Sequence, residues 1–226
     1  MLPRTPLARR LWSASAVLLA SAVSVQALRG SVKPYAPDSP AYRQKGEPGA
    51  RVVIVEFSDL QCPACRFAVG PMKDLLKLYG ADARLIFKHF PLGQHKLAVP
   101  AAVAADCAGR QDKFWEFHDL AYENQLEWNP APPPGKEAPS LPEREKTARK
   151  AFLSYAKKLR LDPAAFTACL DDPAAAALVE ADRREADARW VLSTPTFFIN
   201  GKRFVGARQL AEGGVPWIEK LLKEKR

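Results

Sequence analysis

The segment from Arg51 to Phe57 (RVVIVEF) constrains the fold more than any other part of the chain. It is almost continuously β-branched or aromatic, which is typical of a strand buried on both faces of a sheet. A helical pattern follows from Cys62 to about Tyr79, in which Pro71 predicts a kink or break and Gly80 an end. A second apolar run, Arg84–Phe90, completes a strand–helix–strand unit. Such a unit predicts two parallel strands joined by a right-handed crossover.

The middle of the chain shows helical spacing only. We expect helices at residues 98–108, 112–124, 143–159, 163–170 and 173–189. Asp112, Asp162 and Asp172 are placed to cap three of these helices, the last two directly before a proline in the first turn. The stretch from Leu126 to Pro142 contains six prolines and is therefore expected to be a loop.

Strand character returns near the C-terminus. Thr196–Ile199 and Lys202–Val205 flank Asn200-Gly201, a strong hairpin signal, and Pro216–Lys223 predicts a closing helix. The order β-α-β, helices, β-β-α predicts an α/β, thioredoxin-like fold with a central helical insertion. We expect an extended N-terminal segment at 28–50, a thioredoxin-like domain at 51–96 and 190–226, and an inserted helical domain at 97–189.

The first 27 residues are predicted to be an export signal. Arg9-Arg10 belongs to a basic start without acidic residues, Leu11–Val23 is apolar, and Val25-Gln26-Ala27 has the small-x-small pattern of a cleavage site. An uncleaved membrane anchor is the alternative. We therefore expect a periplasmic or otherwise extracytoplasmic protein.

Charge and composition exclude several classes of function. The 226 residues are 47% apolar and 26% charged, which is ordinary for a globular protein. The net charge of +9 comes from Lys and Arg scattered among Asp and Glu, without a basic stripe interleaved with aromatic residues. We therefore expect no nucleic-acid partner, and we expect a monomer.

The motif Cys62-Pro63-Ala64-Cys65 carries the predicted chemistry. It lies between a buried strand and a helix, where free backbone N–H groups and the helix dipole favour a thiolate on Cys62. Pro63 suits the first helical position. We expect Cys62 to be the exposed nucleophile and Cys65 the buried resolving thiol. Half of a zinc site and a purely structural disulfide are the alternatives, but no second close Cys or His pair is present.

Four segments in this order resemble the DsbA-like branch of the thioredoxin superfamily: Val55–Phe67 (VEFSDLQCPACRF), Phe87–Leu92 (FKHFPL), Lys113–Asp119 (KFWEFHD) and Thr194–Gly206 (TPTFFINGKRFVG). The resemblance implies a protein disulfide oxidoreductase that works through a mixed disulfide and needs no cofactor. It also implies that the Thr194–Pro195 bond is cis and faces the redox pair, and that Glu56 lies under the active site and helps to move a proton.

Several residues have more than one interpretation. Glu56 lies in an apolar strand, where a carboxylate is costly unless paired or solvated, so it is either a functional acid, with Lys88 as a candidate partner, or an edge residue facing solvent. Cys107 and Cys169 are expected to form a structural disulfide, with free buried thiols or a regulatory role as alternatives. His95 and His118 are expected at the surface or at helix caps.

The predicted function is donation of the Cys62–Cys65 disulfide to cysteine-containing unfolded or partly folded proteins, with reoxidation by a membrane redox partner. Ala64 supplies no charge between the cysteines. The reduction potential is therefore expected between about −120 mV, for the strongest oxidants, and about −270 mV, for thioredoxin. A periplasmic reductase or isomerase is the alternative, and a metal-handling protein that binds through the CxxC pair is the alternative from another class.

Overall fold

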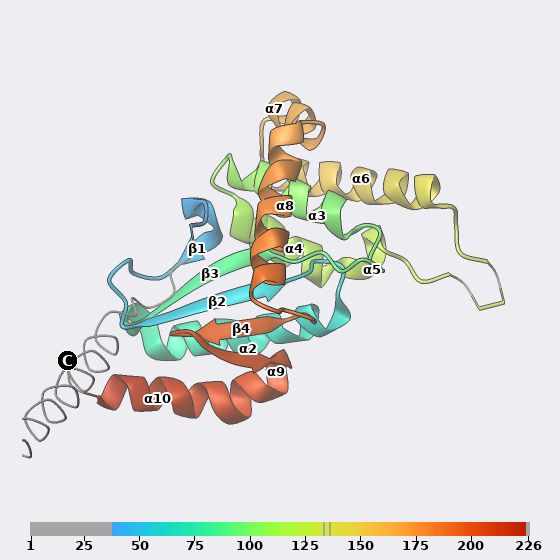
Figure 1. Ribbon diagram of the computed structural model, residues 1–226. Coiled ribbons are helices and arrows are strands. Elements are labelled where there is room, and N and C mark those ends of the chain that lie inside the picture. Colours follow the sequence, from blue (N-terminus) through green and yellow to red (C-terminus); the bar gives the residue numbers. More distant parts are fainter. Residues whose placement is uncertain (1–37, 133, 136, 225–226) are drawn as a thin grey trace, which may run out of the picture. The chain divides into compact units, whose positions relative to one another are not determined.

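The computed structural model describes residues 38–132, 134–135 and 137–224, so the predicted export signal at 1–27 lies outside the described residues. Its framework is a five-stranded sheet in the order β1-β3-β2-β4-β5 (Figure 1). The strands are β1 (Gln44–Lys45), β2 (Val52–Ser58), β3 (Ala83–His89), β4 (Thr196–Ile199) and β5 (Lys202–Val205). The predicted parallel pair is β2 and β3, and the other neighbours are antiparallel.

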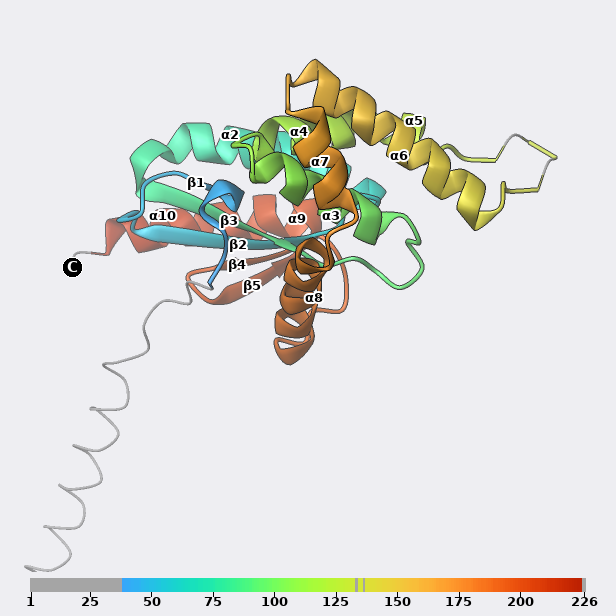
Figure 2. The ribbon, with the colours of Figure 1, turned by 90° about the horizontal axis from the view of Figure 1, so that it is seen from above.

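Helices cover both faces of this sheet (Figure 2). One face packs against α2 (Pro63–Tyr79), α9 (Gly206–Gln209), the π-helical turn η3 (Leu210–Gly214) and α10 (Val215–Lys223). The apolar contacts there join Ile54 of β2 and Phe197 of β4 to Met72 of α2 and Ile218 of α10. The other face carries α8 (Pro173–Ala188), on the side of the sheet opposite α2.

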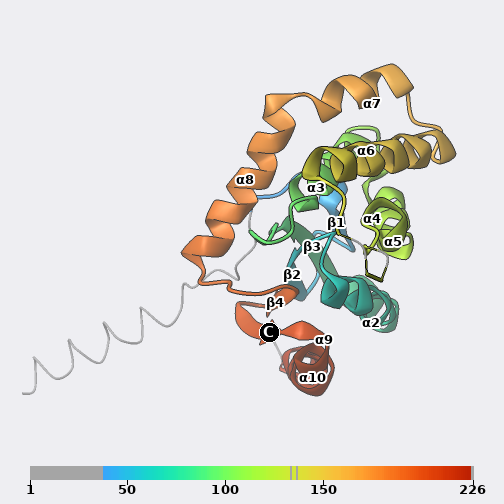
Figure 3. The same cartoon turned by 90° about the vertical axis from the view of Figure 1, so that its right-hand side faces the viewer.

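The helical insertion lies between β3 and β4 and contains α3 (Ala98–Gly109), α4 (Phe114–Glu123), α5 (Gln125–Trp128), α6 (Leu141–Lys158), α7 (Pro163–Leu170) and α8 (Figure 3). Its core is aromatic: Phe117 lies with its ring centroid 5.9 to 6.0 Å from those of Phe152, Tyr155 and Phe166. The element order confirms the predicted α/β layout with a central helical insertion.

Predictions for helix ends were partly wrong. Asp162 and Asp172 do cap α7 and α8, each accepting a backbone N–H at 2.8 Å. Asp112 does not cap α4, because it has φ of 59° and Lys113 holds the N-cap position. Part of the predicted proline-rich loop is helical, since α5 ends at Trp128, which is fully buried.

Pro71 does not end α2, which runs without interruption to Tyr79. The proline nitrogen cannot donate to the carbonyl one turn earlier, that of Phe67. Both residues are exposed, so water can hydrogen-bond that carbonyl and the helix can continue.

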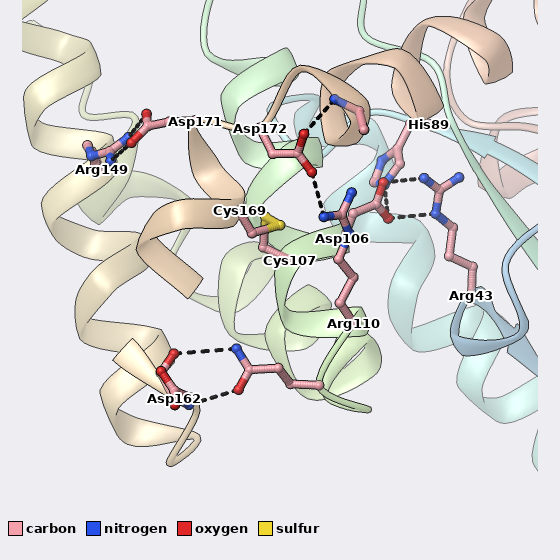
Figure 4. The surroundings of a disulfide bond; sticks show 12 residues. Arg43, His89, Asp106, Cys107, Arg110, Arg149, Asp162, Cys169, Asp171 and Asp172 are labelled. Carbon is pink, nitrogen blue, oxygen red and sulfur yellow. Dashed lines mark hydrogen bonds and ion pairs between the residues drawn. A yellow bond between two sulfur atoms is a disulfide. The ribbon is translucent and has the colours of Figure 1, made fainter. Parts of the chain in front are cut away.

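The segment before β2 is more ordered than its sequence indicates. After a 3-10 turn η1 (Ala41–Arg43) it forms β1, which pairs with β3 at Leu85 and Ile86. Arg43 is fully buried and forms ion pairs with Asp106 of α3 and Asp182 of α8. Figure 4 shows Arg43 and His89 meeting at the Asp106 carboxylate. This cluster ties the segment to the helical insertion, and no short-range pattern in the sequence indicated it.

Candidate active site

Cys62 and Cys65 lie where β2 leads into α2. Cys62 is the N-cap residue, Pro63 occupies the first helical position, and the Cys62 N–H donates to the Asp59 carbonyl at 2.9 Å. Both cysteines are free thiols in this structure. Cys65 is completely buried and Cys62 is only 7% exposed. The expectation of an exposed Cys62 was therefore wrong, because the residue is buried against the loop that contains Thr194.

The two thiols differ strongly in acidity. The pKa of Cys62 is lowered to about 5, mainly by a hydrogen bond from the Cys65 thiol, against the opposing effect of burial. Thr194 and the backbone N–H groups of Ala64 and Cys65 lower this pKa further. Burial and the nearby Cys62 sulfur raise the pKa of Cys65 well above its usual value. At neutral pH the reduced site therefore holds a thiolate on Cys62 and a neutral thiol on Cys65.

The loop that precedes β4 forms the opposite wall of the site. The Thr194–Pro195 peptide bond is cis, and the Thr194 carbonyl oxygen lies 3.7 Å from Cys62 Sγ. The buried Thr194 hydroxyl lowers the pKa of both thiols but makes no hydrogen bond of ordinary geometry. The backbone of Pro195 is in turn held by a 2.8 Å hydrogen bond from the Gly206 N–H to the Pro195 carbonyl.

Glu56 lies in β2 with its side chain 6% exposed, and burial raises its pKa to about 7. Lys88 is not its partner. Glu56 is opposite Phe87 in the parallel register and Phe57 is opposite Lys88, so the two charged side chains point to opposite faces of the sheet. Lys88 instead binds Asp182 at 3.0 Å and Glu185 at 2.9 Å. Near neutral pH the Glu56 carboxyl can therefore both take up and give up a proton.

The turn that carries Cys62 is held by Asp59, a functional residue that was not among those predicted from the sequence. The buried Asp59 carboxylate accepts the Gln61 N–H at 2.7 Å and the Leu92 N–H at 2.9 Å, and lies 2.7 Å from His95 Nδ1. The bond to Gln61 is local, and an aspartate two residues before its partner is a recognisable turn signal. The bonds to Leu92 and His95 join distant segments and leave no such signal.

His118 is buried, so the expectation of a surface or capping histidine was wrong for this residue. It lies one helical turn after Phe114 on the apolar face of α4. The centroid of its ring lies 5.2 Å from that of Phe87 and 4.8 Å from that of Tyr122. Its Nδ1 lies 3.0 Å from Asp119 Oδ1. Burial lowers the pKa of His118, which keeps the ring neutral at physiological pH.

Cys107 and Cys169 form a disulfide with an S–S distance of 2.02 Å, which joins α3 to α7 (Figure 4). It lies in the helical insertion, in a different part of the fold from the CxxC pair. Within residues 38–132, 134–135 and 137–224, no group of three or more His, Cys, Asp or Glu side chains is placed to hold a metal ion. In the same ranges no helix is long and apolar enough to cross a membrane.

Comparison with known proteins agrees with this arrangement. A thioredoxin family profile matches residues 38–215, which includes the CxxC motif, the cis-proline loop and the whole helical insertion. The chain belongs to the thioredoxin family. Its structural neighbours are DsbA-like proteins, which are a branch of the thioredoxin superfamily.

Three solved structures illustrate the likeness. Pseudomonas aeruginosa DsbA2 is 25% identical, with a TM-score of 0.60 over 83% of this chain and 100% of that chain. Oxidised BdbD from Bacillus subtilis is 24% identical, with a TM-score of 0.62 over 80% and 93%. A protein-disulfide isomerase from Novosphingobium aromaticivorans is 20% identical, with a TM-score of 0.64 over 80% and 97%. The thioredoxin-like fold with inserted helices is therefore shared.

Sequence relatives also include parts of longer proteins. The chain is 35% identical over 164 residues to the Na(+)/H(+) antiporter NhaA 1 of Salinispora arenicola, a match that covers 72% of this chain and 22% of that protein. The antiporter NhaA of Herminiimonas arsenicoxydans is 31% identical over 163 residues, covering 72% and 23%. This thioredoxin-family chain thus spans less than a quarter of either relative.

Proposed function

We propose that this protein is an exported thiol:disulfide oxidoreductase that donates the Cys62–Cys65 disulfide to cysteine-containing unfolded or partly folded proteins. The observation that carries the proposal is the placement of the two cysteines: Cys62 caps the N-terminus of α2 next to the Thr194 carbonyl, and Cys65 is completely buried. A low pKa makes Cys62 both the reactive nucleophile and the better leaving group, while the high pKa of Cys65 suits a resolving thiol.

The exchange needs no cofactor. A substrate thiolate attacks Cys62 Sγ, the Cys62–Cys65 bond breaks, and Cys65 leaves as a thiolate that takes up a proton. A second substrate thiolate then attacks the substrate sulfur of the mixed disulfide, and Cys62 leaves as a stable thiolate. The substrate is oxidised by two electrons and the CxxC pair is reduced by two. A membrane redox partner would remove these electrons and restore the disulfide.

Net oxidation follows from stabilisation of the reduced form. The Cys62 thiolate is stabilised by neutral donors, namely the Cys65 thiol, Thr194 and backbone N–H groups. Ala64 adds no charge, which supports a reduction potential between about −120 mV and about −270 mV. A value as low as that of thioredoxin would support a reductase or isomerase instead.

Exposed apolar side chains near the cysteines support a protein substrate. Phe67 follows the CxxC motif on α2 and is 75% exposed, and Leu192 lies two residues before Thr194 and is 84% exposed. Trp190, at the start of the same loop, is 75% exposed. Apolar groups presented beside a reactive site suit unfolded polypeptide, which exposes apolar side chains of its own.

A trapping experiment tests the proposed function. Cys65→Ser should accumulate mixed disulfides between Cys62 and substrate proteins, because no resolving thiol remains. The matched variant Cys62→Ser leaves only the buried, high-pKa thiol and should trap none. Non-reducing gels and mass spectrometry of captured peptides provide the measurement. Equal trapping by both variants, or trapping by Cys62→Ser alone, would overturn the assignment.

A further inference from the structure

Two polar side chains of β2 face α4 beside Cys65. Glu56 and Ser58 are two residues apart, so they point to the same side of the sheet. His118 and Tyr122 are four residues apart on α4 and share one helix face. Ser58 is completely buried, and its Oγ lies 3.1 Å from Tyr122 Oη. The N–H of the next residue, Asp59, donates to Cys65 Sγ at 3.4 Å, so the hydroxyl pair lies beside both the acid and the resolving thiol.

The Ser58 hydroxyl interacts with both groups that must exchange a proton. It lowers the pKa of the Cys65 thiol and of the Glu56 carboxyl, because its single proton can be donated to either anion in turn. Tyr122 Oη donates to the Asp59 carbonyl at 3.2 Å, so its oxygen accepts from Ser58. In the resting site the single serine proton therefore points to Tyr122, and it turns toward the Cys65 sulfur when that sulfur leaves as a thiolate.

We propose that Ser58 is the relay through which a proton passes between Glu56 and Cys65 during disulfide exchange. When Cys65 leaves as a thiolate, the Glu56 carboxyl gives its proton to Ser58 Oγ while Ser58 gives its own hydroxyl proton to the Cys65 sulfur. Glu56 is left as a carboxylate, and no electrons move beyond those of the exchange itself. The reverse transfer accompanies attack by Cys65. The inference rests on the proposed function and adds a residue to its mechanism.

A small cavity gives Glu56 a route to exchange its proton with solvent. The cavity measures about 20 Å³, and its lining includes Glu56 and Trp115. This is room for one water molecule. Trp115 Nε1 is buried and has no hydrogen-bond partner among the described residues, so it can donate to such a water. The other titratable side chains that line the cavity are Lys45 of β1, Lys73 of α2, and His118 and Asp119 of α4.

The test measures how fast the oxidised protein forms a mixed disulfide with an aromatic thiol that is fully ionised across the pH range used. In the wild type only protonated Glu56 can supply the proton, so the rate should fall as pH rises through about 7. Ser58→Ala should slow the reaction about 100-fold, the lower end of what a positioned acid or base contributes. It should also abolish the dependence on pH near 7. Ser58→Thr keeps a hydroxyl and should restore both the rate and the pH dependence.

Tyrosine variants test the orientation of the relay. Tyr122→Phe should slow the reaction less than Ser58→Ala, because the serine hydroxyl remains. Tyr155→Phe removes a comparable buried hydroxyl from the helical insertion, where it bonds Glu127, and should leave the rate unchanged. Ser58→Ala with the wild-type rate and pH dependence would overturn the relay while leaving exchange at Cys62 intact. A wild type that forms no mixed disulfide would instead overturn the proposed function.

Discussion

The two cysteine pairs of this protein differ in which end of a helix they occupy. Cys62 caps the N-terminus of α2, whereas Cys107 lies in the last turn of α3 and Cys169 in the last turn of α7. The N-terminal end of a helix carries a partial positive charge and the C-terminal end a partial negative charge. A thiolate is therefore stabilised at Cys62 and destabilised at the other two positions.

Accessibility does not separate the two pairs. Cys169 is 8% exposed, which is close to the 7% of Cys62. A surface pocket of about 420 Å³ adjoins both Cys107 and Cys169. Arg110 also lines this pocket, but its guanidinium is paired with Asp172 at 2.7 Å and so adds little net positive charge. Electrostatics at the helix ends, more than exposure, therefore distinguishes the pair proposed to be reactive from the Cys107–Cys169 disulfide.

The largest expected effect is a difference in reduction potential between the pairs. Structural disulfides lie below about −300 mV, so we expect the two potentials here to differ by at least about 30 mV, and by about 180 mV at the oxidising end of the predicted range, which is about 10-fold to 10⁶-fold in the equilibrium constant. In glutathione buffers Cys62 and Cys65 should titrate while Cys107 and Cys169 stay bonded. Alkylation followed by mass spectrometry measures both pairs in one sample. Coincident titration of the pairs would show that helix position does not set the difference.

The next effect is on stability. The Cys107–Cys169 bond joins residues separated by 62 positions, a loop whose closure in the unfolded chain is worth about 4 kcal/mol. The double variant Cys107→Ser/Cys169→Ser should lose about that much free energy of unfolding in a denaturant titration. The matched control, Cys62→Ser/Cys65→Ser, removes a bond that closes only a very short loop. It should therefore lose much less free energy of unfolding. Equal losses would mean that the length of the closed loop does not set what each bond contributes to stability.

Local patterns were sufficient to predict most elements of the fold. The strands Thr196–Ile199 and Lys202–Val205 were predicted with the observed bounds, because Asn200-Gly201 defines the hairpin between them. The asymmetry of the cysteines follows from the strand-to-helix position of the motif, which short-range patterns reveal. Long-range polar contacts were not predictable in the same way. The two-residue strand β1 has too little sequence to show a period, and it depends on its pairing with β3.

The errors at the site have the same physical origin. Lys88 follows Phe87 in a strand, and only the parallel register shows that it points away from Glu56. His118 lies among apolar residues on α4, and only packing against β3 buries it. Ser58 belongs to the DsbA-like segment Val55–Phe67, but nothing in that segment marks it as a partner of Tyr122, which is distant in sequence. Register and packing between elements, which carry these contacts, are set by the whole fold and not by any one segment.

The smallest of the three effects concerns Glu56, the buried acid beside the CxxC pair. Asp106, the buried acid next to Cys107, is instead ion-paired with Arg43. Burial raises the pKa of Glu56 from 4.5 to about 7, so the folded state binds a proton more tightly than the unfolded state. Ionising Glu56 therefore lowers the free energy of unfolding. This loss is absent below pH 4.5, grows as the pH rises, and is complete above about pH 7. Glu56→Gln should therefore raise the free energy of unfolding by about 3 kcal/mol at high pH and by little in acid.

Denaturant titrations of the reduced protein across this pH range provide the measurement. Glu123→Gln is a suitable control, because Glu123 is exposed at the end of α4 and its replacement should change stability little at any pH. The gain from Glu56→Gln should come with slower exchange at Cys62, because the variant has no carboxyl proton to supply. A gain that does not depend on pH would show that Glu56 is not held with a raised pKa. A pH-dependent gain in stability with an unchanged rate of exchange at Cys62 would show that Glu56 destabilises the fold but takes no part in the reaction of the cysteines.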